Sequence, residues 1–149
     1  MSSDQITVER TINAPAASIF ALLSDAAKHS EIDGSGTVKG TRQDTRPLKL
    51  GTKFGMSMHM GAAYKTSNEV VEFEQDRRIA WKTTGAKGLI GGRIWRYELS
   101  PTDSGTLVKE TWDVSQDKQK FFLKRSRLAP AAKVGMRKTL ERIAETLES

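Results

Sequence analysis

The chain has 149 residues, a formal net charge of +6 and no cysteine. This length predicts a single domain over residues 1–149, and the lack of cysteine excludes disulfides and thiolate chemistry. The first residues, MSSDQITVER, contain no apolar signal core, and no apolar run reaches the ~20 residues of a membrane span, so we expect a cytoplasmic protein. The positive charge favours acidic partners but is too dispersed for a dedicated nucleic-acid binder.

The N-terminal part predicts one strand followed by two short helices. Residues 6–12 alternate with period two and carry β-branched side chains on both faces, which is typical of a strand. Pro15 suits the first turn of a helix, and apolar residues at helical spacing then continue to about Asp25. Residues 26–32 predict a further brief helical turn before a glycine-containing loop.

The middle of the chain predicts six more strands. They cover residues 37–42, 52–60, 64–74, 78–84, 93–99 and 106–114. The connections between them are short, as in antiparallel neighbours. With the first strand, they predict a seven-stranded antiparallel sheet.

Residues 128–148 predict a long amphipathic helix. Its apolar stripe consists of Ala132, Met136, Leu140, Ile143 and Leu147. These residues are spaced by four, four, three and four positions, so they share one helical face. The opposite surface is charged, so the helix must bury its stripe against a broad partner. The chain therefore predicts an α+β packing in which the sheet curls over this helix and a cavity lies between them.

Six segments carry a resemblance to a known family. They are VERTINAPAASIFALLSD, HSEIDGSGTV, LGTKFGMSMHMG, NEVVEFEQDRRIAWKTTG, RIWRYELSP and GTLVKETWDV. In this order they resemble the START-like, polyketide cyclase/dehydrase-like superfamily, also called SRPBCC, over residues 6–147. The resemblance implies a helix-grip fold, with a curved seven-stranded sheet wrapped around the C-terminal helix and two short helices after the first strand. It also implies that a pocket between the concave sheet and that helix holds an apolar small molecule.

Strand alternation indicates which side chains face this pocket. One face of the strand at 52–60 is formed by Phe54, Met56, Met58 and Met60. A methionine row of this kind is typical of plain core and equally of a pocket that adapts to its occupant. The residues predicted to bind the ligand are Arg10, Phe54, Met56, Met58, Tyr64, Asn68, Trp81, Trp95, Tyr97, Glu110, Trp112, Phe121, Met136 and Leu140.

The strand at 64–74 leaves two alternatives open. If a two-residue turn follows it, the residues on the face of Trp81 are Tyr64, Asn68 and Val70. If the turn differs by one residue, the inward residues are Val71 and Phe73 instead.

Glu110 shares a strand face with apolar residues and therefore needs a partner. The first and last strands are neighbours in the fold that the resemblance implies, and Arg10 shares a face with Val8 and Ile12. We therefore expect Glu110 to be buried and paired with Arg10. Such a pair is either a structural ion pair or a device that orients a carbonyl or hydroxyl group of the ligand.

Three classes of function fit these observations. The first is binding of a hydrophobic small molecule such as a lipid, polyketide, isoprenoid or quinone. The second is a cyclase or dehydrase, in which Glu110, Tyr64 or His59 transfers protons and Arg10 polarises a carbonyl. The third is a protein-interaction module like the Hsp90-activator branch of the superfamily. No residue spacing suggests a metal or a cofactor, and His29 is interpreted as solvated, with a pair to Asp33 as the alternative.

The segment from Lys118 to Lys138 contains eight basic residues and no acidic one, with Phe121 and Phe122 near its start. One interpretation is a solvated face beside phenylalanines that anchor the core. Our hypothesis is a mobile pocket entrance with the phenylalanines as an apolar gate. In it, an acidic head group or an anionic membrane surface is attracted by Lys120, Lys124, Arg125 and Arg127.

Overall fold

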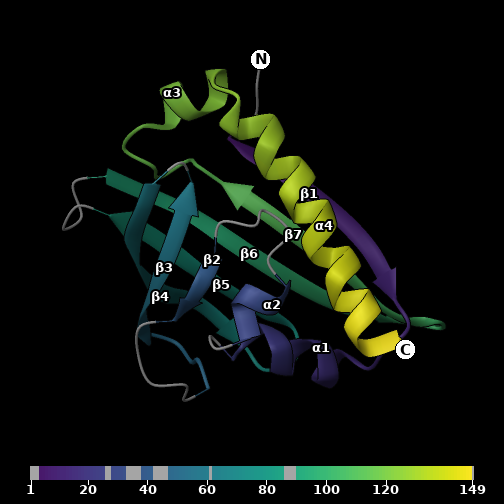
Figure 1. Ribbon diagram of the computed structural model, residues 1–149. Coiled ribbons are helices and arrows are strands. Elements are labelled where there is room, and N and C mark those ends of the chain that lie inside the picture. The colour runs from purple at the N-terminus through teal and green to yellow at the C-terminus, as the bar shows by residue number, and fades with distance from the viewer. Residues whose placement is uncertain are drawn as a thin grey trace.

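One antiparallel sheet and one long helix laid across it make the two layers of the fold (Figure 1). The computed structural model describes residues 4–25, 28–32, 38–41, 47–60, 62–85 and 90–148. The strands are β1 (Gln5–Ile12), β2 (Val38–Thr41), β3 (Lys53–Met60), β4 (Ala62–Glu74), β5 (Arg78–Gly85), β6 (Ile90–Thr102) and β7 (Gly105–Asp113). The helices are α1 (Ala16–Leu23), α2 (His29–Ile32), α3 (Lys120–Arg125) and α4 (Leu128–Glu148).

The strands follow the order β1-β7-β6-β5-β4-β3-β2, and all neighbours are antiparallel. The predicted α+β class and the helix-grip arrangement are confirmed. In Figure 1, α1 and α2 lie at one end of the sheet, α3 lies at the other, and α4 runs between them. Within the described part of the chain, no helix has the length and apolar composition needed to cross a bilayer.

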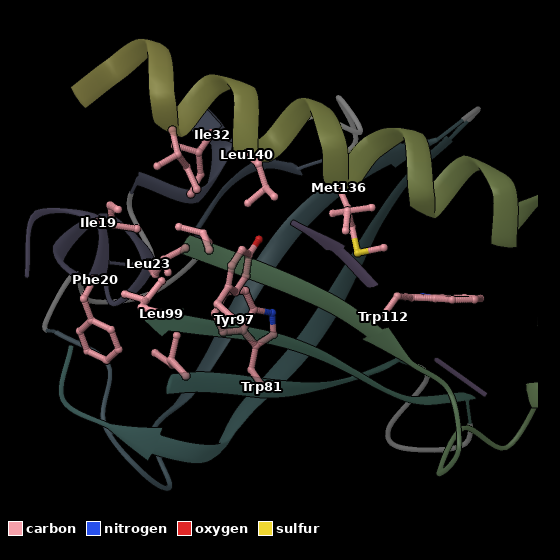
Figure 2. Packing of buried hydrophobic residues seen from close by; sticks show 14 of the residues in the cluster. Ile19, Phe20, Leu23, Ile32, Trp81, Tyr97, Leu99, Trp112, Met136 and Leu140 are labelled. Atoms are coloured by element: carbon pink, nitrogen blue, oxygen red, sulfur yellow. The ribbon is translucent and has the colours of Figure 1, made fainter. Parts of the chain in front are cut away.

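The packing of α4 follows its sequence period. Its buried residues are Gly135, Met136, Thr139, Leu140, Ile143 and Ala144. This stripe packs against β1 and β7, and α4 also contacts the three shorter helices. Figure 2 shows Met136 and Leu140 directed from α4 toward the sheet. At its C-terminal end, Glu148 Oε2 accepts a 2.8 Å hydrogen bond from the backbone N–H of Asn13. The final helix is therefore tied to the end of the first strand.

Each of the two alternatives for β4 holds in part: Asn68 and Val70 are buried as the first predicted, and Phe73 packs on the core as the second predicted, but Tyr64 is exposed and Val71 is not part of the core. Glu74 pairs with Arg78, so the turn has three residues, and Asp76 adopts φ 62° within it. Phe73 consequently lies opposite Ile79. A β-bulge between Val70 and Glu72 then shifts the register by one residue, which places Val70 opposite Trp81. Both Phe73 and Val70 therefore contribute to the hydrophobic core.

The β6 strand begins three residues earlier than predicted, at Ile90. Gly91 and Gly92 have φ of 100° and 111°, a region that favours glycine. A Cβ at Gly91 would meet the Thr83 carbonyl oxygen at 2.6 Å, and one at Gly92 would meet that of Gln116 at 2.6 Å. The two glycines thus allow the strand to continue through a bulge against β5 and beside the segment that leads to α3.

Candidate functional site

A cluster of aromatic side chains lies on the inner face of the sheet. Its members are His29 from α2, Phe54 from β3, Trp81 from β5 and Tyr97 from β6. All four are buried, at 4%, 3%, 7% and 5% exposure. In Figure 2, Trp81 and Tyr97 lie beside each other beneath α4, and the Tyr97 hydroxyl is directed toward the helix.

The rings of this cluster meet in the geometries that aromatic quadrupoles favour. His29 stacks on Trp81 with ring centroids 4.8 Å apart and an interplanar angle of 20°. Phe54 meets His29 and Trp81 edge to face, at 5.7 Å and 5.9 Å. Trp81 contacts Tyr97 at 5.6 Å. Offset and edge-to-face pairs of this kind stabilise beyond their buried area, so the cluster forms a fixed wall beneath α4.

Glu110 is the acidic residue of this face, and it is only 2% exposed. Its burial confirms the prediction from strand alternation. The β6–β7 register places Tyr97 directly opposite Glu110, and the Tyr97 hydroxyl donates a 2.8 Å hydrogen bond to Glu110 Oε2. A hydrogen bond to a carboxylate is stronger than one between neutral groups. Such a pair can accept or donate a hydrogen bond, or hold a proton, in an apolar setting.

The expected ion pair between Arg10 and Glu110 is wrong. The β1–β7 register places Val8 opposite Glu110 and Arg10 opposite Val108. Arg10 is exposed, whereas Glu110 is buried and accepts a hydrogen bond from Tyr97 instead. Arg10 shares the sheet face of Glu110 but lies two residues further along β1 than Val8, and its side chain is exposed to solvent.

The interpretation of His29 as a solvated side chain is also wrong. The ring is 4% exposed, and its Nε2 lies 2.9 Å from the carbonyl oxygen of Leu23. The alternative partner, Asp33, lies outside the described residues. One signal could have revealed the burial: Ile32 is three residues further on, so it shares the helical face of His29, and it is also buried.

Asn68, which is 2% exposed, is another buried polar residue beside the aromatic cluster. Its amide nitrogen donates to the Phe54 carbonyl oxygen at 3.3 Å, and its amide oxygen accepts from the Thr83 hydroxyl at 2.7 Å. These bonds join β3, β4 and β5 beside the aromatic rings. Asn68 therefore positions the strand that carries Phe54.

The remaining predicted site residues divide between core and surface. The core contains Met56, Trp112, Met136 and Leu140, with Trp95 half-buried against it. Tyr64 and Phe121 are 40% and 68% exposed, so the structure does not bring them into the aromatic cluster. The side chains of Met58, Met60 and His59 lie outside the described part.

The opposite face of the sheet carries a network of ion pairs. Arg96 on β6 donates to both carboxylate oxygens of Glu72 on β4, at 2.9 Å and 2.7 Å, and to Asp113 Oδ2 on β7 at 3.4 Å. It reaches across Ala80, which pairs with both Arg96 and Glu72 in the sheet and is fully buried. The small alanine side chain leaves room for this bridge over β5.

The network shifts the ionisation of its members. The hydrogen bond from Arg96 lowers the pKa of Glu72 below its usual value and raises the pKa of Arg96. Burial alone would raise the pKa of Asp113, but hydrogen bonds from Ser115 and Arg96 outweigh it and the net shift is downward. These groups are held charged at neutral pH, which is typical of a structural network.

Comparison with known proteins places these features in a family context. A profile of the family described as polyketide cyclase / dehydrase and lipid transport matches residues 3–148. The uncharacterized protein Rv0088 of Mycobacterium tuberculosis is 37% identical over 106 residues, which cover 68% of this chain and 44% of the relative. The chain thus spans less than half the length of the curated relatives that it matches.

Several solved structures share the fold. Protein NE0264 from Nitrosomonas europaea has a TM-score of 0.75 at 16% identity, covering 99% of this chain and 97% of the other. The Polyketide_cyc-like protein Cgl2372 from Corynebacterium glutamicum has a TM-score of 0.61 at 23% identity, covering 99% and 93%. The AHSA1-like protein from Aeromonas hydrophila has a TM-score of 0.67 at 17% identity, covering 97% and 92%.

Proposed function

Because the chain belongs to the polyketide cyclase/dehydrase and lipid transport family, we propose that it binds a hydrophobic small molecule between the sheet and α4. The observation that carries this proposal is the hydrogen bond between Tyr97 and Glu110, both buried on an aromatic sheet face. The ligand is an apolar compound with a carbonyl or hydroxyl group, such as an oxygenated lipid, polyketide, isoprenoid or quinone.

Stability gives no reason to place a carboxylate at position 110. Moving a charged carboxylate out of water is costly, and an apolar residue of similar size in a core is often equal or better for stability. The flanking inner-face residues of β7, Val108 and Trp112, are apolar and buried. A polar pair retained among them is instead suited to recognising a polar atom of a ligand, since such atoms set orientation in mostly apolar sites.

The first test is native mass spectrometry of the protein purified from its own host. We expect a retained apolar compound of fixed mass that contains oxygen. Recovery of empty protein would count against the proposal unless added ligands bind, so a second measurement uses defined probes. Binding of 1-naphthol and of 1-methylnaphthalene, which have similar size, is followed by tryptophan fluorescence. We expect 1-naphthol to bind more tightly.

Variants assign this preference to the buried pair. Tyr97→Phe and Glu110→Gln should remove most of the preference for 1-naphthol while leaving 1-methylnaphthalene binding nearly unchanged. Glu98→Gln, which alters a half-exposed carboxylate on β6 that pairs with Arg78, is the matched control and should leave both affinities unchanged. If neither probe binds and no compound is retained, the proposal is wrong.

A second candidate is a cyclase or dehydrase acting on the bound compound. The observation that favours it is the joint burial of Glu110, Tyr97 and His29, three groups that can hold or transfer protons. The test is incubation of the retained compound with stoichiometric protein, followed by mass spectrometry. A product that is absent with Glu110→Gln would establish chemistry, whereas an unchanged compound would leave binding alone.

A further inference from the structure

We propose that α3 and the residues that follow it form a docking surface for an anionic lipid bilayer. The α3 surface consists of Phe121, Phe122, Arg125 and Arg127. The two phenylalanines are each 68% exposed, and both arginines are exposed. The proposal goes beyond ligand binding, because the bilayer meets the outside of the molecule at the end of the sheet opposite α1 and α2 (Figure 1).

Helix geometry makes the α3 surface continuous. Arg125 lies three residues after Phe122 and four after Phe121, and residues at these spacings are neighbours on a helix. Exposure of two adjacent large aromatic side chains is unusual for a soluble surface, where contiguous apolar patches mark interaction sites. An arginine beside them supplies a cation at the same place.

The opposite side of α3 is fixed to the body of the protein, which keeps the phenylalanines outward. Leu123 is 2% exposed. Lys124 Nζ lies 2.8 Å from Asp4 Oδ1, and Lys120 Nζ lies 3.9 Å from Asp4 Oδ2. The hydrogen bond from Lys124 lowers the pKa of Asp4. Lys124, which the sequence suggested for binding head groups, therefore orients α3 through Asp4. Lys120 Nζ lies over the Phe121 ring, 5.3 Å from its centroid, so Lys120 stands at the edge of the α3 surface, and head-group contact falls mainly to Arg125 and Arg127.

The start of α3 is held as firmly. Asp117 accepts a 3.3 Å hydrogen bond from Arg93 and a 2.7 Å bond from the N–H of Gln119. The Gln119 side chain in turn accepts a 2.9 Å bond from the N–H of Gly91 on β6. These contacts present a preformed surface, which reduces the conformational entropy lost on binding.

The charge of the region selects an anionic partner. The eight basic residues between Lys118 and Lys138 are accompanied by no acidic residue. On α4, Lys133, Arg137 and Lys138 are exposed and add to the positive surface. Membrane binding by peripheral segments combines apolar insertion with attraction to anionic lipids, each cation near the surface adding to affinity. Phe121 and Phe122 supply the first contribution and the basic residues supply the second.

The test is flotation of the purified chain with vesicles of phosphatidylcholine alone or with 30% phosphatidylglycerol, at about 50 mM and about 500 mM salt, where the Debye length falls from roughly 14 Å to roughly 4 Å. We expect binding to the anionic vesicles that falls at least about tenfold in high salt. Bare vesicles contain no specific ligand, so the result is independent of the proposed small-molecule site.

Two variants with matched controls locate the surface. Phe121→Ser with Phe122→Ser should weaken binding at least about tenfold, whereas Leu50→Ser, at a residue 65% exposed elsewhere, should have little effect. Arg125→Glu with Arg127→Glu should weaken binding by a similar factor. Lys49→Glu with Arg77→Glu makes the same change in net charge at exposed positions outside α3 and should weaken binding much less.

Three outcomes would overturn the proposal. The first is equal binding to neutral and anionic vesicles. The second is an equal loss of vesicle binding in the α3 variants and in their control variants. The third is self-association that the phenylalanine variant abolishes, without vesicle binding, which would assign the surface to a second copy of the chain. Retention of 1-naphthol binding in the α3 variants would show that a failure concerns docking and not the ligand site.

Discussion

The carboxylates on the two faces of the sheet have different kinds of partner. On the outer face, Glu72 and Asp113 meet the guanidinium of Arg96, which spans β5 to reach both. On the inner face, Glu110 meets the hydroxyl of Tyr97 among aromatic rings. The outer network reaches the surface through Glu72, whose side chain is 29% exposed, and it sets its carboxylates against a guanidinium, whereas the inner pair is buried beneath α4.

This difference shows which face serves stability and which serves a ligand. Ion pairs near a surface contribute modestly and tolerate water. A buried carboxylate contributes little to stability even when it is well hydrogen-bonded, so its retention favours a role in recognition. Three variants test the contrast, beginning with the aromatic wall on which the inner pair depends.

The largest effect is expected for Trp81→Ala. Trp81 is 7% exposed and contacts His29, Phe54 and Tyr97, so its removal leaves a large void beside three rings. We expect the free energy of unfolding, measured by urea denaturation, to fall by about 3–5 kcal/mol. Tyr64→Ala is the control: Tyr64 is 40% exposed, and its loss should cost less than about 1 kcal/mol. Similar costs would contradict the assignment of Trp81 to the core.

A smaller effect is expected for Tyr97→Phe. This change removes the hydroxyl that donates to Glu110, which should lower the free energy of unfolding by about 1–3 kcal/mol. In a double-mutant cycle with Glu110→Leu, the coupling energy should reach about 1 kcal/mol. A cycle of Tyr97→Phe with Arg78→Ala, which changes the outer face, should be additive within about 0.5 kcal/mol. Additivity in both cycles would show that the inner hydrogen bond has no energetic role.

The smallest effect, and the one that depends on pH, is expected for Arg96→Met. Because Glu72 is partly exposed and the buried Asp113 keeps hydrogen bonds from Ser115 and Gln5, the variant should lose only about 1–2 kcal/mol at pH 7. Folding lowers the pKa values of Glu72 and Asp113, so their stabilisation is present above the unfolded values near 4 and is lost as pH falls through the lower folded values.

The measurement for Arg96→Met is the free energy of unfolding as a function of pH from about 7 to about 2. The variant should lose less stability toward acid than the parent, since its carboxylates no longer gain from Arg96. Arg77→Ala, which removes the exposed partner of Glu74 outside the network, is the control and should cost less than about 1 kcal/mol. If Arg96→Met loses as much free energy of unfolding toward acid pH as the parent does, the proposed source of the pKa shifts is wrong.

The elements that the sequence predicted well are those whose signal is local. The apolar stripe of α4 and the alternation that buries Glu110 depend only on residues a few positions apart. The pairing of Arg10 required the offset between two strands more than ninety residues apart, which no local pattern contains. His29 was obscured because the turn-forming residues around it favoured a solvated loop, although Trp81 and Phe54 cover its ring. The helix α3 was not predicted separately, because its six residues are fixed by Asp117, Gly91 and Asp4.

The bulge at Val71 divides β4 into two parts, and in each part the alternation of inward and outward side chains is set independently. The three-residue turn sets the phase of Phe73, and pairing with β3 and the rest of β5 sets that of Val70 and Asn68. Deleting Val71 would force one phase on the whole strand and expel one of these sets from the core. A gain or loss of one residue in the turn would instead reverse the facing of Glu72 and Phe73, while the bulge separates Val70 and Asn68 from that change. The bulge thus confines the effect of an altered turn length to the half of β4 next to the turn and leaves the aromatic wall in place.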